Sequence, residues 1–288
     1  MIDRRVSTVR RTLILLGGIG AGLILAFSVV GSGHFDTGSM GAGQDAHAYW
    51  RAVRVFPYGP DAGTFGAYLY SPAFLQVLQP IRILPWQAYM AAWTLILLGA
   101  LVVLTGRRWL AVGVVLALME LAGGNIHLLL AAAIVLGFRW PWTWSLVLLT
   151  KITPGIGLLW FVVRQEWRNL AIALGGTAAI VAVSFLLLPD AWFGWAEVLS
   201  RVAGRDGTWA AVPIPFVLRF PVAVVLVVWG AWTGRRWTVP VAGMLALPAL
   251  WYGGLSMLLA VIAVKENVAP APPLPGWLGK RFGQLAST

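Results

Sequence analysis

Long apolar runs recur along the whole chain, and they constrain the fold more than any other feature of the sequence. Hydrophobic residues make up 59% of the 288 positions and charged residues only 11%, a composition that soluble domains do not have. A helix of about 20 apolar residues crosses a bilayer, so the chain has room for about nine transmembrane segments. Because hydrocarbon does not tolerate open backbone polar groups, we expect an all-α, polytopic helical membrane protein.

The apolar runs and the turns between them predict where the membrane segments lie. The first, Thr12–Val30, has the character of an uncleaved anchor. Asp45–Val55 and Ala191–Ala203 have the pattern of helices that lie on a membrane surface. The other apolar segments are Ser71–Leu84, Trp86–Thr105, Ala111–Ala122, Ile126–Phe138, Trp144–Thr150, Gly155–Val163, Asn169–Leu188, Ala210–Trp232 and Thr238–Val264. We expect one transmembrane domain over residues 1–264 and a proline-rich tail over residues 265–288.

The positive charge comes mostly from arginine, and its distribution predicts the topology. The net charge is +11, and only three of the 21 basic residues are lysines. The arginines lie mainly at the edges of apolar runs, which fits the positive-inside rule and anionic lipid headgroups rather than nucleic acid. All the arginine turns are cytoplasmic only if Ser71–Leu84 enters the membrane and returns. Asn125, Lys151 and the loop Pro189–Trp209 then lie at the outer side.

Lys151 is the only lysine inside an apolar run, and an ammonium at membrane depth costs about 3 kcal/mol unless it is paired or lines a wet cavity. Pro154 has no N–H group and disfavours helix at Thr153. We therefore expect a helix that ends near Lys151, a turn over Ile152–Pro154, and a new helix from Gly155. The free N–H groups of that helix would point at the lysine, which predicts an anion site. The alternative is a kinked helix whose lysine extends to the interface.

Two polar residues come at the start of predicted helices, and each has two interpretations. Asp45 begins an amphipathic helix, so it is either a catalytic carboxylate or the N-cap of that helix. Asn125 opens an apolar helix, so it either caps that helix or hydrogen-bonds a substrate hydroxyl. Other acids that could lie at the outer side are Asp190, Glu197 and Asp206 in the later loop, and Asp36 and Asp61 in the first, whose positions the glycine-rich sequence fixes poorly.

Three further polar residues lie within apolar sequence. Glu120 is an intramembrane carboxylate and hence a functional candidate, unless it pairs with an arginine or stays protonated. His127 follows Asn125 closely, and Arg219 is a second possible phosphate partner. The absence of cysteine excludes disulfides, and the three scattered histidines do not predict a metal site. A carboxylate over a membrane cavity with fixed cations suits group transfer from a lipid-phosphate donor.

The order of the motifs resembles a known enzyme family. The motifs are D-x-x-x-Y-W at Asp45–Trp50, Tyr68–Pro72, Gly124–Asn125, Lys151–Pro154 and the basic turn Arg164–Arg168. In this order and spacing they resemble the polyprenol-phosphate-mannose-dependent mannosyltransferases of glycosyltransferase family 87, the DUF2029 group of the GT-C superfamily. The resemblance covers about Asp45–Leu188. Many relatives have glutamine where Asn125 stands, and a late W-x-H motif is replaced by Leu247–Gly254, which has no histidine.

The resemblance implies a GT-C helical fold and an inverting transfer of a hexose, mannose in our expectation, from a polyprenyl-phosphate donor to a glycolipid or glycan hydroxyl. It implies no metal and no cofactor, and an acidic base in the first outer loop, for which Asp45 is the candidate. Our candidates for substrate binding are Lys151, Asn125, Glu120, His127, Tyr49 and Arg219. We expect a multi-pass protein of the plasma membrane with an active site on the outer face. The alternatives are a non-catalytic lipid-phosphate-binding or flippase-like protein of the same fold, and a small-solute transporter.

Overall fold

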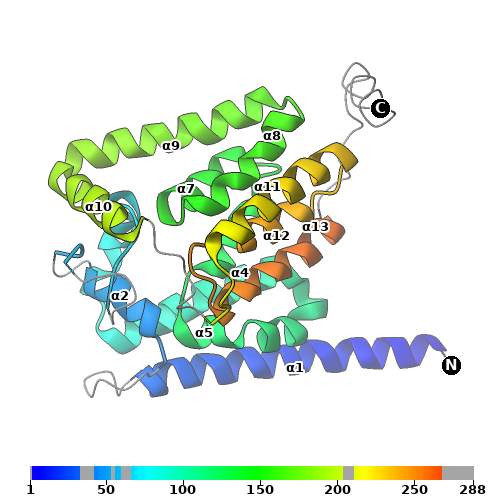
Figure 1. Ribbon diagram of the computed structural model, residues 1–288. Helices are drawn as coiled ribbons and strands as arrows, with labels where there is room; N and C mark the ends of the chain where they lie inside the picture. The colour runs from blue at the N-terminus through cyan, green and yellow to red at the C-terminus, as the bar shows by residue number, and fades with distance from the viewer. Residues whose placement is uncertain (1, 33–41, 53–55, 60–65, 204–210, 268–288) are drawn as a thin grey trace, which may run out of the picture.

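The structure is a computed structural model that describes residues 2–32, 42–52, 56–59, 66–203 and 211–267. Every regular element within these residues is a helix, which confirms the all-α class (Figure 1). Four helices of this part of the chain are long and apolar enough to cross a membrane. They are Ser7–Gly31 within α1 (Ile2–Gly31), α4 (Trp86–Leu116), α9 (Trp167–Leu187) and α11 (Phe216–Thr233).

Between the long helices the chain forms short helices separated by turns. The α-helices are α2 (Gln44–Ala52), α3 (Pro72–Leu78), α5 (Leu118–Gly123), α6 (His127–Leu136), α7 (Trp144–Thr150), α8 (Leu159–Val163), α10 (Pro189–Val202), α12 (Thr238–Leu245) and α13 (Ala260–Asn267). The 3₁₀ helices are η2 (Gln79–Ile83), η3 (Pro141–Thr143), η4 (Thr153–Leu158) and η5 (Tyr252–Leu259). Helix α3 spans about 10 Å and runs directly into η2, and that this segment enters the membrane and returns stays a prediction.

Helix α4 consists of two arms that fold back on each other at Gly106. The backbone of Gly106 is left-handed, with φ 58° and ψ 178°, which glycine adopts without strain. A Cβ atom built on Gly113 would lie 3.1 Å from the side chain of Leu101. In one continuous helix these two residues would be about 18 Å apart. The basic turn expected between Trp86–Thr105 and Ala111–Ala122 is therefore present.

Glycines let α1 pack closely along the second arm of α4. A Cβ atom on Gly17 would lie 3.0 Å from Leu110, and one on Gly20 would lie 3.3 Å from Val114. Small residues at such contacts allow helix backbones to approach in a membrane, where packing rather than the hydrophobic effect drives association. Helix α1 therefore lies along one side of the molecule (Figure 1).

The two ends of the molecule gather different kinds of segments. At one end three of the turns that carry arginines lie together: Arg164 donates to the carbonyl of Ala231 at 3.0 Å, and Arg236 lies 5.2 Å from the ring centroid of Phe138. At the opposite end α10 packs on the first loop, where Arg201 donates to the carbonyl of Tyr58 at 2.9 Å. Figure 1 shows α2 and α10 far from the N-terminus and from the turn between α8 and α9. Which side of the membrane each end faces stays a prediction from the arginine pattern.

The expectation of one continuous segment over Thr238–Val264 is wrong. The chain leaves α12 at Leu245, runs irregularly past Pro248, and continues as η5 and then α13. Pro248 lacks an N–H group and disfavours helix at the residue before it, which explains the break. Such a break is tolerated inside a membrane protein only where its backbone polar groups find partners, and Arg219 supplies them here.

Candidate active site

Glu120 caps the helix that carries His127. Gly124 adopts a left-handed conformation with φ 70°, which ends α5 and turns the chain toward α6. One oxygen of Glu120, Oε1, accepts the backbone N–H of His127 and, at 3.4 Å, that of Leu128. A buried carboxylate thus satisfies N–H groups at the start of α6 and complements the positive end of the helix dipole. The partner of Glu120 is therefore this helix start and not an arginine.

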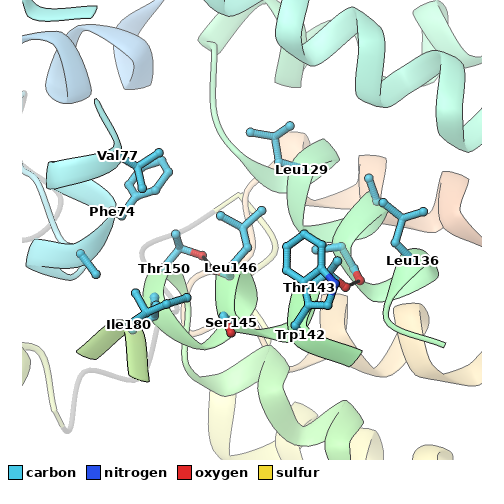
Figure 2. Close-up of a pocket in the computed structure, with 14 residues that line it drawn as sticks. Phe74, Val77, Leu129, Leu136, Trp142, Thr143, Ser145, Leu146, Thr150 and Ile180 are labelled. Carbon is cyan, nitrogen blue, oxygen red and sulfur yellow. Dashed lines mark hydrogen bonds between the residues drawn. The ribbon is translucent and has the colours of Figure 1, made fainter. Parts of the chain in front are cut away.

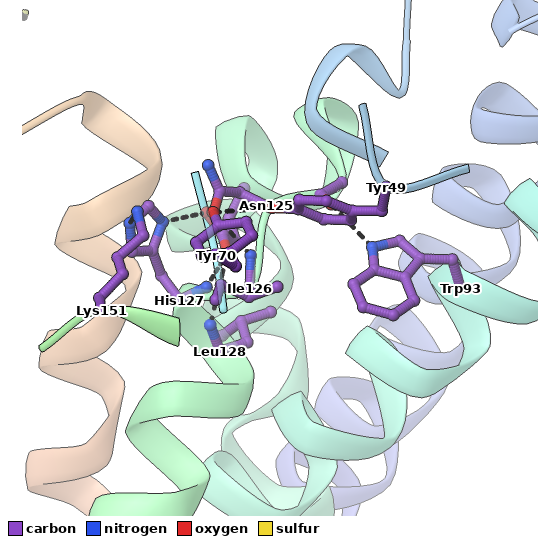
Figure 3. Close-up of polar contacts among 10 residues, drawn as sticks. Tyr49, Tyr70, Trp93, Asn125, Ile126, His127, Leu128 and Lys151 are labelled. Carbon is purple, nitrogen blue, oxygen red and sulfur yellow. Dashed lines mark hydrogen bonds and ion pairs between the residues drawn. The ribbon is translucent and has the colours of Figure 1, made fainter. Parts of the chain in front are cut away.

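Glu120, His127 and Lys151 form a continuous chain of polar contacts. His127 Nδ1 lies 2.8 Å from Glu120 Oε2, and His127 Nε2 lies 2.7 Å from Lys151 Nζ (Figure 3). An ammonium can only donate, so Nε2 must accept, and the proton of the neutral imidazole is then on Nδ1, which donates to the carboxylate. The contacts define the tautomer of His127 and give each of its ring nitrogens one partner.

Lys151 lies where the sequence placed a helix break, although the next segment differs from the expectation. Helix α7 ends at Thr150, and Lys151 has an extended backbone with φ −126° and ψ 100°. The chain then continues as the 3₁₀ helix η4 rather than as an α-helix from Gly155, and α8 begins only at Leu159. Gly157 of η4 packs directly against the ring of Trp144, where a side chain would not fit. Lys151 therefore faces His127, and no α-helix begins at Gly155 to supply the expected anion site.

Asn125 lies within a group of hydroxyls. The hydroxyls of Tyr49 and Tyr70 are 3.0 Å apart, and they lie 3.3 and 3.4 Å from Asn125 Oδ1. The same oxygen accepts the N–H of Ile126 at 2.7 Å (Figure 3). Because Glu120 already binds the first N–H groups of α6, Asn125 is not the cap of that helix. Its amide oxygen is fixed by the tyrosines, and its amide nitrogen is left to face Asp45.

Asp45 is the second residue of α2 and lies beside this polar group. The N–H of Gly43 donates to the carbonyl of Ala122 at 2.6 Å, which ties the start of α2 to α5. Burial raises the pKa of the Asp45 carboxyl, Lys151 lowers it, and Glu120 raises it; a hydrogen bond from Asn125 also lowers it. A Cβ atom built on Gly123 would lie 3.2 Å from Asp45 Oδ2, so the carboxylate lies beside the turn that carries Asn125. Asp45 is inside the first turn of α2, so it is not the N-cap.

Arg219 makes a different set of contacts. Its Nε donates to the carbonyl of Ile214 at 2.8 Å, its Nη1 to those of Leu245 and Leu247 at 2.7 Å each, and its Nη2 to that of Pro248 at 3.0 Å. Arg219 is 3% exposed. The hydrogen-bond partners of Arg219 within the described residues are thus backbone carbonyls, three of them at the broken end of α12 and one just before α11.

Asp45, Glu120, Asn125, His127 and Lys151 together form what we call the polar centre. Sequence reasoning missed two residues that pack against it. Tyr70 lies with its ring 6.0 Å from the Lys151 ammonium, and it was noted only as part of a motif. Gly253 packs so closely on Glu120 that a Cβ atom there would lie 2.7 Å from Oε2. The paired glycines at 253 and 254 were the available signal, since adjacent glycines in an apolar run often mark a close approach.

A sequence model of glycosyltransferase family 87 matches residues 68–269. The chain belongs to glycosyltransferase family 87. No curated protein and no solved structure matches it. The matched residues of this family 87 protein include Glu120, Asn125, His127 and Lys151, whereas α2 with Asp45 precedes the match. The family indicates a membrane glycosyltransferase, which acts on a sugar donor and an acceptor. The match thus covers these four residues but not Asp45 and Tyr49 of α2.

Proposed function

We propose that this family 87 protein transfers a hexose, mannose in our expectation, from a polyprenyl-phosphate donor to an acceptor hydroxyl, with inversion at the anomeric carbon. The acceptor is a glycolipid or glycan, the fold is of the GT-C type, and the reaction takes place on the outer face of the plasma membrane. The observation that supports this most strongly is the convergence of Asp45, Asn125 and Lys151 from three separate segments. A base, a hydroxyl-binding amide and a cation are the groups that such a transfer needs.

The roles follow from the chemistry of each group. Asp45 takes the proton of the acceptor hydroxyl as its oxygen attacks the anomeric carbon. The bond from that carbon to the phosphate oxygen breaks, and the polyprenyl phosphate leaves with the electron pair. Lys151 stabilises the negative charge that develops on this leaving group. The raised pKa of the Asp45 carboxyl strengthens it as a base, while Lys151 nearby keeps the ionised form accessible.

An apolar cavity beside the polar centre supports a lipid-linked donor. It has a volume of about 400 Å³ and lies between α3, α6, α7 and α9. Figure 2 shows Phe74 and Val77 of α3 across from Leu146, with Thr150 between them and Ile180 close by. Thr150 lines this cavity and directly precedes Lys151. An isoprenoid chain in the cavity would therefore hold its phosphate close to the lysine.

Transfer activity tests the proposal directly. Membranes that contain the protein are incubated with radiolabelled polyprenyl-phosphate mannose, and the glycolipid products are analysed. We expect a labelled product, and we expect Asp45→Asn to lower turnover by ~10²–10⁴ while donor binding stays nearly unchanged. Asp190→Asn on the exposed face of α10 is the matched control.

Two results would contradict this assignment. Donor binding without any labelled product would favour a non-catalytic lipid-phosphate binder. Normal turnover of Asp45→Asn would move the base to another outer acid, including Asp61 or Asp206, which lie outside the described residues.

The proposed sidedness has its own test, because the chain has no natural cysteine. Single cysteines at positions 197 and 166 are labelled with a membrane-impermeant maleimide on intact cells. We expect label at position 197, which is exposed on α10, and none at position 166, since the turn Arg164–Arg168 carries arginines that resist translocation. Outside labelling at position 166 would overturn the arrangement.

A further inference from the structure

The contacts of Lys151 depend on the proton position of one imidazole. Lys151 Nζ lies 2.7 Å from His127 Nε2, which is its recorded hydrogen-bond partner within the described residues. That nitrogen accepts only while the imidazole proton stays on Nδ1. Glu120 Oε2 holds the proton there, at 2.8 Å from Nδ1. The direction of the Lys151 side chain is thus set by a carboxylate that it does not touch.

Burial separates Glu120 and His127 from any substrate. They are 1% and 2% exposed, whereas Lys151 and Asn125 are partly exposed. Gly253 closes the side of Glu120 away from the helix start, and Gly254 lies near His127. A group that binds the sugar or the acceptor must be reachable, and these two are enclosed by the protein.

We propose that Glu120 and His127 form a positioning pair: Glu120 fixes the tautomer of His127, His127 aims the ammonium of Lys151, and neither touches the sugar or the acceptor. This inference rests on the proposed role of Lys151 at the donor phosphate. A lysine has a flexible four-carbon stem, so without a fixed acceptor its ammonium samples many positions. The pair removes that freedom, and the anchoring of Glu120 on the backbone of α6 makes the pair rigid.

An isosteric change at Glu120 separates positioning from direct contact. In Glu120→Gln the amide oxygen still accepts the N–H groups of α6, while the amide nitrogen faces His127 Nδ1. Because that nitrogen must then accept, the imidazole proton moves to Nε2, where it opposes the Lys151 ammonium. We expect donor affinity, measured with polyprenyl-phosphate mannose in nanodiscs, to fall about ten- to hundredfold. Glu197→Gln, on the exposed face of α10, is the matched control.

A second variant tests the same contact by changing His127 instead of Glu120. His127→Asn retains a donor for Glu120 but has no atom where Nε2 lies, so it should lose donor affinity to a similar extent. Neither loss should add to that of Lys151→Met, because both act through the lysine. Losses that add fully in the double variants, or a raised acceptor KM with unchanged donor affinity, would overturn the proposal.

The tautomer itself is measurable without any substrate. The chain has three histidines, so ¹⁵N NMR of labelled protein, with His127→Asn for assignment, reports the protonated nitrogen of His127. We expect Nδ1–H in the natural protein and Nε2–H in Glu120→Gln, together with a shifted Lys151 Nζ signal. An Nε2–H tautomer in the natural protein overturns the positioning pair. If the tautomer agrees but no sugar is transferred, the pair stands and the proposed transfer fails.

Discussion

Lys151 and Arg219 are both cations inside apolar sequence, and both fit a phosphate site from sequence alone, yet the structure surrounds them differently. Arg219 uses three nitrogens on four backbone carbonyls, three of them at the broken end of α12 and the fourth, that of Ile214, just before α11. The ammonium of Lys151 has one hydrogen bond within the described residues, to His127, and two carboxylates within electrostatic reach. The guanidinium of Arg219 donates its N–H groups to backbone carbonyls of the same chain. The ammonium of Lys151 has further N–H groups that can bind a ligand.

The number of donors that the chain itself satisfies distinguishes a structural cation from a functional one. A guanidinium presents a rigid fork, which suits several carbonyls at a helix break, where unpaired groups would be costly in a membrane. A single fixed acceptor sets the direction of an ammonium and leaves its other N–H donors available. Variants at the two positions should therefore affect different measurements.

The largest effect should come from Arg219→Met, on stability. The substitution leaves several buried carbonyls around Leu245, Leu247 and Pro248 without a donor, and each costs about 1–3 kcal/mol unless water replaces it. We expect a loss of about 3 kcal/mol or more in the free energy of unfolding. Thermal unfolding in detergent and the yield of folded protein measure it. A variant with an unchanged Tm and weakened donor binding would show that Arg219 serves the ligand after all.

Lys151→Met should have the opposite profile. Methionine has a similar length and no charge, and the contact to His127 is the single hydrogen bond that the ammonium gives up within the described residues, so we expect little change in Tm. Donor affinity should fall about ten- to hundredfold, because a charge-assisted contact to the phosphate is lost. Lys265→Met, at an exposed position of α13, is the matched control. Unchanged donor affinity in Lys151→Met would remove the lysine from the donor site.

Gly253→Ala should act on Lys151 from a distance. The added methyl group would lie 2.7 Å from Glu120 Oε2, so the carboxylate must shift and the contact to His127 weakens. Overpacking of this kind costs about 1–3 kcal/mol, and we expect it to appear partly as reduced donor affinity. Gly99→Ala, which meets nothing within 4 Å, is the control and should be neutral. Equal behaviour of the two variants would mean that η5 moves away freely.

The local features of the site were predictable, because they rest on local rules. Pro154 and the isolated lysine predicted the helix break at Lys151, and the turn at Gly124 predicted a helix start beside Asn125. The hairpin at Gly106 followed from its flanking arginines and glycine. The turn chemistry of these residues acts over a few positions, so the sequence shows it directly.

The partners of the charged residues were not predictable. Glu120 and Gly253 are more than a hundred positions apart, and nothing in the local pattern says that η5 closes on α5. The partners of Arg219 are carbonyls at a break within Thr238–Val264, and hydropathy alone does not show that break. Pro248 marked this break, but the length and apolarity of the run outweighed it. Long-range packing decides which carbonyl or carboxylate meets a buried cation.

The smallest expected effect is on the pH dependence of kcat/KM, where variants at Lys151 and at Arg219 should differ. Burial raises the pKa of the Asp45 carboxyl and Lys151 lowers it, whereas Arg219 is not among its influences. A base acts only when deprotonated, so the acid limb of kcat/KM should lie above the ordinary aspartate pKa of about 3.9. Lys151→Met removes the lowering influence, so the limb should move to higher pH. Arg219→Met should leave the limb of its folded fraction in place.

The same shift has a consequence for stability. A folded-state pKa above the unfolded value means that the folded protein binds the Asp45 proton more tightly, so this residue's contribution to stability falls as pH rises through the interval between the two values. Asp45→Asn should remove that part of the pH dependence of Tm, and Lys151→Met should extend it to higher pH. Rate profiles and Tm measured from pH 4 to pH 8 test both signs. A limb that moves to lower pH in Lys151→Met would show that the lysine does not face the base.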